Sequence, residues 1–127
     1  MGKFVIKDAK GGVKFDLKAG NGEIILSSEI YSSVTSCKNG IASVQKNAPI
    51  AALEDQTVEG FEKQKNPKFE VYTDKAGETR FRLKASNGEI IGVGESYKEK
   101  ASCLNGIESI RKNAADSEIV DDREAAK

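Results

Sequence analysis

The sequence has no His, and only two Cys and two Pro among its 127 residues. Without His it lacks the side chain that most often acts as a general base near neutral pH and most often binds metal ions. Cys37 and Cys103 lie 66 positions apart, a spacing that matches no zinc-binding or redox motif. The sequence therefore predicts no metal site, no cofactor and no catalytic residue.

The sequence also has no excess of positive over negative charge, or the reverse. The 20 Lys and Arg residues equal the 20 Asp and Glu residues in number, so the formal net charge is zero. No overall field attracts such a chain to nucleic acid or to an anionic membrane. No apolar run is long enough to cross a bilayer, and the N-terminus shows no basic-then-apolar leader. We expect a cytoplasmic protein without a membrane partner, for which nucleic acid is not the preferred partner and the partner itself is unknown.

The sequence does contain a long repeat. Residues 15–48 and 81–114 align without a gap, and 20 of the 34 aligned positions are identical. In both copies apolar residues alternate with polar ones, reach Asn-Gly, and continue as a second apolar run. This pattern is typical of a β-hairpin closed by a two-residue turn.

The expected turn at residues 21–22 sets the register of the hairpin. It pairs Ala19 with Ile24 and places both in the core, and it leaves Ile25 on the opposite face. Asp16 should lie on that opposite face and be exposed to solvent. The same assignments apply 66 residues later in the second copy.

After Tyr31 the apolar period changes from two to about 3.6 residues. We expect a helix that begins near a capping Ser32 or Ser33 and ends at Pro49. The apolar stripe of this helix is Cys37, Ile41, Val44 and Ala48, and that of the second helix is Cys103, Ile107, Ile110 and Ala114. On such a stripe a Cys acts as a small hydrophobic residue.

These elements predict an α+β fold in which two helices pack on an antiparallel sheet. Repeat 1 covers residues 1–55, a connector covers 56–67, repeat 2 covers 68–121, and 122–127 form a loose tail. A unit of about fifty residues buries little surface alone. We therefore expect the repeats to share one core, related by a pseudo-twofold axis, in a monomer built like an internal dimer.

The motif Phe-x-Leu-Lys-Ala-x-Asn-Gly-Glu-Ile-Ile begins at Phe15 and is followed by Glu29, Tyr31 and Cys-x-Asn-Gly-Ile-x-Ser-Val from Cys37. With its second copy, this pattern resembles the YegP-like family of uncharacterised, mostly bacterial proteins, which occur as single units or tandem repeats. The resemblance covers residues 3–55 and 68–121. It implies a β3-α-β unit and lends no catalytic residues.

The resemblance further implies that the two units exchange their final strands, here residues 50–55 and 117–121. One departure concerns the third strand of repeat 2. Gly92 and Gly94 stand there in place of Leu26 and Ser28, which leaves the structure of this strand open.

Polar residues that occur in both copies are the candidate ligand-binding residues: Glu29, Tyr31, Asn39, Glu95, Tyr97 and Asn105. Each Glu precedes a Tyr by two positions, so the pair could line a polar pocket; we favour hydrogen bonds that fix the strand-to-helix corner. Asn inside a helix is a poor choice unless its side chain is bonded. A buried bond to a loop carbonyl is the favoured interpretation, and a ligand contact is the alternative.

A second candidate surface is the basic face formed by Arg80, Arg82 and Lys84, which alternate with core positions. We favour a solvated sheet face, with weak binding of an anion or nucleic acid as the alternative. For the whole chain the preferred hypothesis is a non-enzymatic binding or interaction module of unknown ligand. The others are a nucleic-acid or anion binder using the basic face, and an enzyme using the Glu and Tyr pairs as acid and base.

Overall fold

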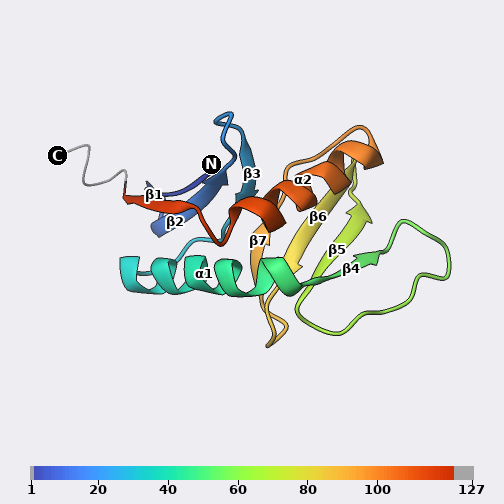
Figure 1. The fold of residues 1–127 in the computed structure, drawn as a ribbon, viewed down its shortest axis with the longest axis horizontal. Helices are drawn as coiled ribbons and strands as arrows, with labels where there is room; N and C mark the ends of the chain where they lie inside the picture. The colour runs from blue at the N-terminus through green and yellow to red at the C-terminus, as the bar shows by residue number, and fades with distance from the viewer. Residues whose placement is uncertain (1, 122–127) are drawn as a thin grey trace.

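The computed structural model describes residues 2–121 and has an α+β fold with one large sheet and two helices (Figure 1). The elements run in the order β1 Lys3–Ala9, β2 Gly12–Lys18, β3 Ile24–Ser27, α1 Val34–Asn47, a 3-10 turn Ala48–Ile50, β4 Ala52–Asp55, β5 Lys68–Thr73, β6 Thr79–Lys84, β7 Ile90–Val93, α2 Lys100–Asn113 and β8 Glu118–Asp121. The expected tail at 122–127 lies outside the described residues.

The sheet has the strand order β4-β5-β6-β7-β3-β2-β1-β8. At its centre the two halves meet through β3 and β7, where Ser27 pairs with Val93. β4 runs parallel to β5, and β8 runs parallel to β1. The expectation of an antiparallel sheet is therefore wrong for these two outer pairs. A strand that follows a helix has no hairpin to force it to run antiparallel to its neighbour.

The two helices bury the predicted apolar stripes against the sheet. α1 contacts β2 and β7, and α2 contacts β3 and β6, so each helix reaches strands of both halves. Ser33 caps α1 by accepting a 3.1 Å hydrogen bond from the Ser36 amide, as one of the two predicted caps. Cys37 and Cys103 are buried and neither is in a disulfide. Burial raises the pKa of the Cys103 thiol to about 11, so this thiol is protonated and unreactive at neutral pH.

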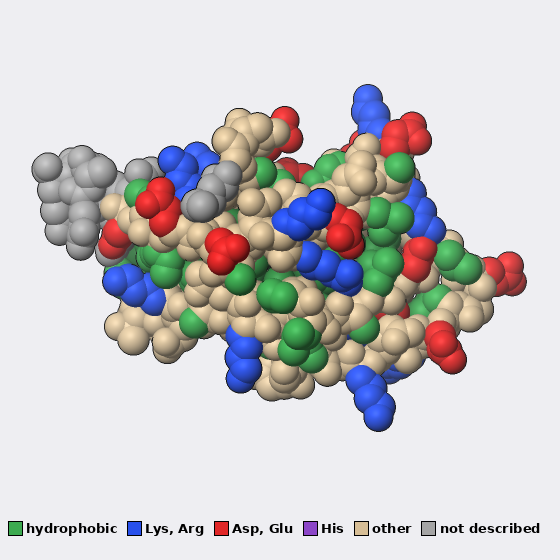
Figure 2. Space-filling view, in the orientation of Figure 1, with side chains coloured by type: hydrophobic (Ala, Val, Ile, Leu, Met, Phe, Trp, Pro, Cys, Tyr) green, Lys and Arg blue, Asp and Glu red, His purple; other side chains and the backbone are tan. Residues whose placement is uncertain are grey.

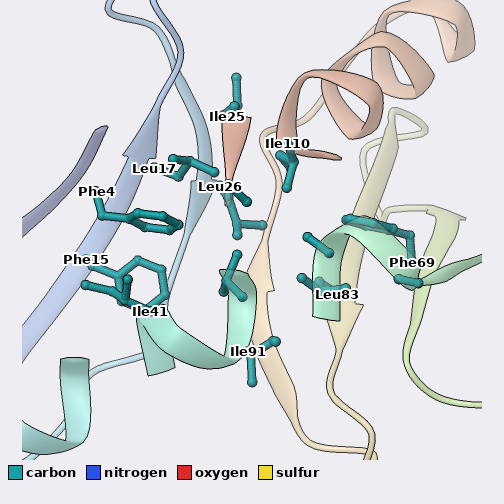
Figure 3. Packing of buried hydrophobic residues seen from close by; sticks show 14 of the residues in the cluster. Phe4, Phe15, Leu17, Ile25, Leu26, Ile41, Phe69, Leu83, Ile91 and Ile110 are labelled. Atoms are coloured by element: carbon teal, nitrogen blue, oxygen red, sulfur yellow. The ribbon is translucent and has the colours of Figure 1, made fainter. Parts of the chain in front are cut away.

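A single hydrophobic cluster contains residues of both halves. Figure 3 shows Leu26 between Leu17 of the first half and Leu83 of the second. Its counterpart in β7 is Gly92, where an added Cβ would lie 2.6 Å from the Leu26 side chain. The third strand of repeat 2 therefore does form, and its glycine gives one leucine room to fill the centre.

The hairpin loops differ from the predicted two-residue turn. The Gly22 amide donates to the Ala19 carbonyl and the Ala19 amide donates to the Glu23 carbonyl, both at 2.9 Å. The loop is therefore three residues long, and only Gly22 has a positive φ, of 87°. A turn with Asn21 and Gly22 at its centre would need a positive φ at both residues, whereas this loop needs one only at glycine.

This loop shifts the register by one residue through a bulge between Leu17 and Lys18. Ile24 therefore pairs with Lys18 and is half-buried, and Ile25 is in the core with 6% of its surface exposed. The predicted faces of these two isoleucines are reversed. The same bulge in the second hairpin leaves Ile90 half-buried and buries its neighbour Ile91 in the core.

Asp16 is also not solvated as predicted, since only 2% of it is exposed. It lies on the sheet face opposite the helices, where Lys7 and Lys14 pair with its carboxylate and the Ser27 hydroxyl donates to it at 2.7 Å. Long lysine side chains from neighbouring strand positions cover it.

Candidate binding site

The basic face is already engaged by protein groups. Arg82 Nε lies 2.6 Å from a carboxylate oxygen of the buried Glu70, and Lys84 Nζ lies 3.3 Å from the other. Arg80 donates to the Gly94 carbonyl at 3.1 Å. On the face covered by the helices, basic and acidic side chains are interspersed (Figure 2). Two of the three side chains of the basic face are therefore already paired with the Glu70 carboxylate.

The strand-to-helix corners are fixed by backbone hydrogen bonds. Tyr31 and Val13 exchange two of them, at 2.9 and 2.7 Å, and Tyr97 and Thr79 exchange two at 2.8 Å. Glu29 and its counterpart Glu95 are exposed, and within residues 2–121 neither forms a hydrogen bond with its tyrosine. The favoured interpretation of the Glu and Tyr pairs is therefore wrong.

Each tyrosine instead packs against the helix of its own repeat. The Tyr31 ring stacks on Phe15 with 6.3 Å between ring centroids, and its hydroxyl lies over Gly40, where an added Cβ would overlap it. Tyr97 and Gly106 repeat this arrangement. Glycine inside a helix costs about 1 kcal/mol relative to Ala. The close approach of a tyrosine ring explains why this cost is tolerated twice.

Two grooves lie beside these tyrosines, each between a helix of one repeat and a hairpin of the other. Groove A, of about 200 Å³, is lined by Tyr31, Ser36, Asn39, Gly40, Ser43, Ala85, Asn87, Glu89 and Ile91. Groove B, of about 430 Å³, is lined by Ala19, Asn21, Glu23, Ile25, Tyr97, Ser102, Asn105, Gly106 and Ser109. The structure thus places the predicted Tyr and Asn of each repeat in one groove. It leaves Glu29 and Glu95 outside both linings.

The pKa of each groove tyrosine is raised, chiefly by burial. For Tyr31, Cys37 and Glu29 add to the effect of burial, and Glu89 of the other repeat adds the smallest part. For Tyr97 the order is burial, Cys103, Glu95 and then Glu23. Both phenols therefore keep their protons at neutral pH and can donate hydrogen bonds.

The lining residues are the same in both grooves. All nine positions of groove A carry the same residue type as the positions of groove B that lie 66 residues away. Of the other 25 positions in the aligned 34-residue repeat, only 11 are identical. The two repeats have diverged around the grooves and not within them.

Asn39 and Asn105 show this most clearly. Both are exposed, and within the described part of the chain neither side chain makes a hydrogen bond. The predicted buried bond to a loop carbonyl is therefore wrong. The residue before each Asn has diverged, from Lys38 to Leu104, while Gly follows both. An exposed, unbonded Asn inside a helix has no packing role that explains its presence in both repeats.

Sequence reasoning missed the hairpin side of each groove, that is Asn21, Glu23, Asn87 and Glu89, together with the serines. One signal could have revealed the helix side. The spacing Ser-x2-Asn-x3-Ser-x3-Asn starts at Ser36 and again at Ser102, which places four polar residues on one helical stripe. At its end Asn47 donates to the Ser43 carbonyl at 2.8 Å and accepts at 3.0 Å from Ser86 of the other repeat's hairpin.

The family model described as "Domain of unknown function (DUF1508)" matches residues 8–55 and 74–121. The chain belongs to this family. The UPF0339 protein YegP of Yersinia pestis is 47% identical over 122 residues, which are 95% of this chain and 96% of the relative. A UPF0339 protein of Treponema denticola is 63% identical over 54 residues, which are 42% of this chain and 93% of the relative.

Two solved structures share the fold of the family. The solution NMR structure of UPF0339 protein SO3888 from Shewanella oneidensis has a TM-score of 0.77 at 35% identity, covering 94% of this chain and 90% of that one. That of yegP from E. coli, described as a protein of unknown function, has a TM-score of 0.75 at 37% identity, covering 94% and 91%. The predicted resemblance, the tandem repeat and the α+β class are confirmed.

These relatives carry no assigned activity, so any function must be argued from the site. Within residues 2–121 no helix is long and apolar enough to span a membrane. In the same range no three His, Cys, Asp or Glu side chains gather where they could hold a metal ion.

Proposed function

We propose that this chain is a non-enzymatic binding module with two equivalent sites, groove A and groove B, each of which takes one small polar molecule. The observation that carries the proposal is the identity of all nine lining residues between the two grooves. Polar groups converging in a concave site are the usual basis for a ligand hypothesis. The enzyme alternative is weaker, because it pairs Glu29 and Glu95 with the tyrosines and neither of these carboxylates lines a groove.

The proposed sites depend on how the repeats combine. We propose that residues 1–55 and 68–121 are two repeats of one domain, related by a pseudo-twofold axis, and that they exchange their last strands. The pairing of β4 with β5 and of β8 with β1 supports this exchange. In such a monomer each repeat contributes a helix to one groove and a hairpin to the other. The lack of a membrane-spanning helix in the described residues and the bacterial relatives suit a cytoplasmic module.

An NMR titration of the 15N-labelled full chain tests the proposal with three probes of similar size and different charge, n-butylammonium, butanamide and butyrate. At least one probe should shift the amide signals of Gly40 and Gly106, which line the two grooves. Shifts that are absent, or that lie mainly outside the grooves, would contradict the proposal.

Asn39→Ala separates a binding role from a structural one. Ala favours a helix over Asn by about 0.5 kcal/mol, so this variant should be slightly more stable while groove A stops responding to the probe. Groove B should respond as before. Lys38→Ala is the matched control, since Lys38 is exposed on the same helix and lines neither groove. A variant that loses stability and keeps its response in groove A would show that Asn39 serves the fold.

A further inference from the structure

We propose that the ligand of each groove is a small primary amine, held by its ammonium group. This inference rests on the proposed function and adds the chemical class of the ligand. Among the residues that the structure describes, Glu89 is the one charged residue in the lining of groove A, and Glu23 is the one in groove B. The remaining polar groups of both linings are neutral amides and hydroxyls. An anion would meet a carboxylate and no cation in either groove.

The carboxylate in each lining favours a ligand that donates hydrogen bonds, since the amides and hydroxyls beside it can both donate and accept. A primary ammonium has three N–H donors and no acceptor, and an ionised carboxylate is only an acceptor. In groove A the Glu89 carboxylate, the amide oxygen of Asn39 and the hydroxyls of Ser36 and Ser43 can all accept. Groove B offers the same set from its identical residues.

The two carboxylates are also available to a ligand, whereas the Ser43 and Ser109 hydroxyls each already accept one hydrogen bond from a helix Asn. Glu89 and Glu23 are exposed, and within residues 2–121 no ion pair or hydrogen bond engages either carboxylate. They differ in this from Glu70, Glu54 and Asp16, whose carboxylates are buried and paired with lysine or arginine. This contrast separates the groove carboxylates from those that stabilise the sheet.

One cation adjoins groove A without lining it. Lys46 lines a neighbouring hollow of about 350 Å³ that shares Asn39 and Ser43 with the groove. Lys46 is seven residues beyond Asn39, which is about 10 Å along the helix axis. Glu89 lines the groove and not this hollow.

Groove volume limits the size of the amine. Groove A encloses about 200 Å³, which corresponds to about seven water molecules at their volume in the liquid. Drug-sized ligands occupy pockets of about 300–1,000 Å³. A short alkylamine fits groove A, and the wider groove B has room for it as well.

The same three probes separate this inference from the proposed function. We expect n-butylammonium to shift the groove amides at lower concentration than butanamide, and butyrate to have no effect there. Equal or tighter binding of butanamide would overturn the amine assignment and leave the binding module standing. No shift in either groove with any probe would overturn both.

Two isosteric variants locate the charge. Glu89→Gln should weaken n-butylammonium binding in groove A by between about 1.5- and fivefold, the range for an exposed ion pair, and leave groove B unchanged. Glu23→Gln should do the reverse. Glu59→Gln, in the exposed connector, removes the same charge elsewhere and should change neither groove. An equal loss in all three variants would show a general charge effect and would overturn the assignment.

Discussion

Replacing Lys68 with Met is expected to destabilise the fold by about 3–5 kcal/mol. Only 3% of Lys68 is exposed, and its ammonium lies 2.8 Å from a carboxylate oxygen of Glu54 and 3.2 Å from one of Glu70. Both carboxylates are themselves buried, with 1% and 3% of each residue exposed. Removing the cation leaves buried negative charge behind, which costs far more than an exposed ion pair contributes.

Loss of the Lys68 ammonium should destabilise the two carboxylates to different extents. Glu70 keeps Arg82 at 2.6 Å and Lys84 at 3.3 Å. Glu54 keeps only neutral partners, the Gln56 side chain at 2.6 Å and the Gln64 amide at 2.7 Å. Most of the cost therefore falls on Glu54, and adding Glu54→Gln to Lys68→Met should recover a large part of it.

Repeat 1 supplies the matched control. Lys3 occupies in β1 the position that Lys68 occupies in β5, since Lys3 faces Lys18 on β2 as Lys68 faces Lys84 on β6. Lys3 is exposed. Lys3→Met should therefore change the free energy of unfolding by less than about 0.5 kcal/mol.

Urea unfolding followed by circular dichroism measures these differences, with thermal melting as a second readout at about 4 °C for each kcal/mol. The parent, the two single variants Lys68→Met and Glu54→Gln, and the double variant make a double-mutant cycle that isolates the pair. An equal effect of Lys3→Met and Lys68→Met would refute the reasoning. So would a double variant no more stable than Lys68→Met alone.

Two further predictions concern the core and acid stability. Ile107→Ala and Ile41→Ala should each lower the free energy of unfolding by about 2–5 kcal/mol, because both side chains are buried between helix and sheet. Lys112→Ala, at an exposed position, should change it by less than about 0.5 kcal/mol. Parent-like melting of either Ile variant would show that its helix packs by another face. Burial of Glu54 opposes its ionisation, but Lys68 and the hydrogen bonds around the carboxylate lower its pKa from 4.5 to about 2. The stability that the ionised carboxylate contributes is therefore complete above about pH 5 and is lost as the pH falls through 4.5 toward 2. Melting temperatures measured from pH 7 to pH 2 should fall over that window, and a constant value would contradict the lowered pKa.

Residue patterns predicted the elements because local physics decides them. The helical stripe from Cys37 to Ala48 is buried in full, and Ser33 caps the helix. The residue pattern does not determine the type of the hairpin loop. Asn-Gly fits both a two-residue turn and a three-residue loop, and the choice between them depends on whether Asn21 adopts a positive φ. One residue of difference exchanged the faces of Ile24 and Ile25.

The sequence did not predict which charged side chains are buried, and the reason is a different one. Asp16 and Glu70 stand at alternating strand positions that normally face water. Lysine and arginine side chains of adjacent strands cover them, and their partners are known only once the strand order is known. Charge alternation along one strand therefore predicts the face of a residue correctly and its exposure wrongly.

The grooves could not be predicted from the pattern of one repeat, because each groove is lined by residues of both repeats. Tyr31 and Asn39 come from repeat 1, but the carboxylate beside them, Glu89, comes from repeat 2. A change at Glu89 would therefore alter groove A alone, and a change at Glu23 would alter groove B alone. If only one groove bound a ligand, the residues that line the other groove would be free to diverge. Of the 25 aligned positions outside the linings, 14 have diverged. Packing accounts for the identical Tyr and Gly of the linings. The identical exposed polar pairs, Asn39 with Asn105 and Glu89 with Glu23, are what we expect when both grooves bind the same ligand.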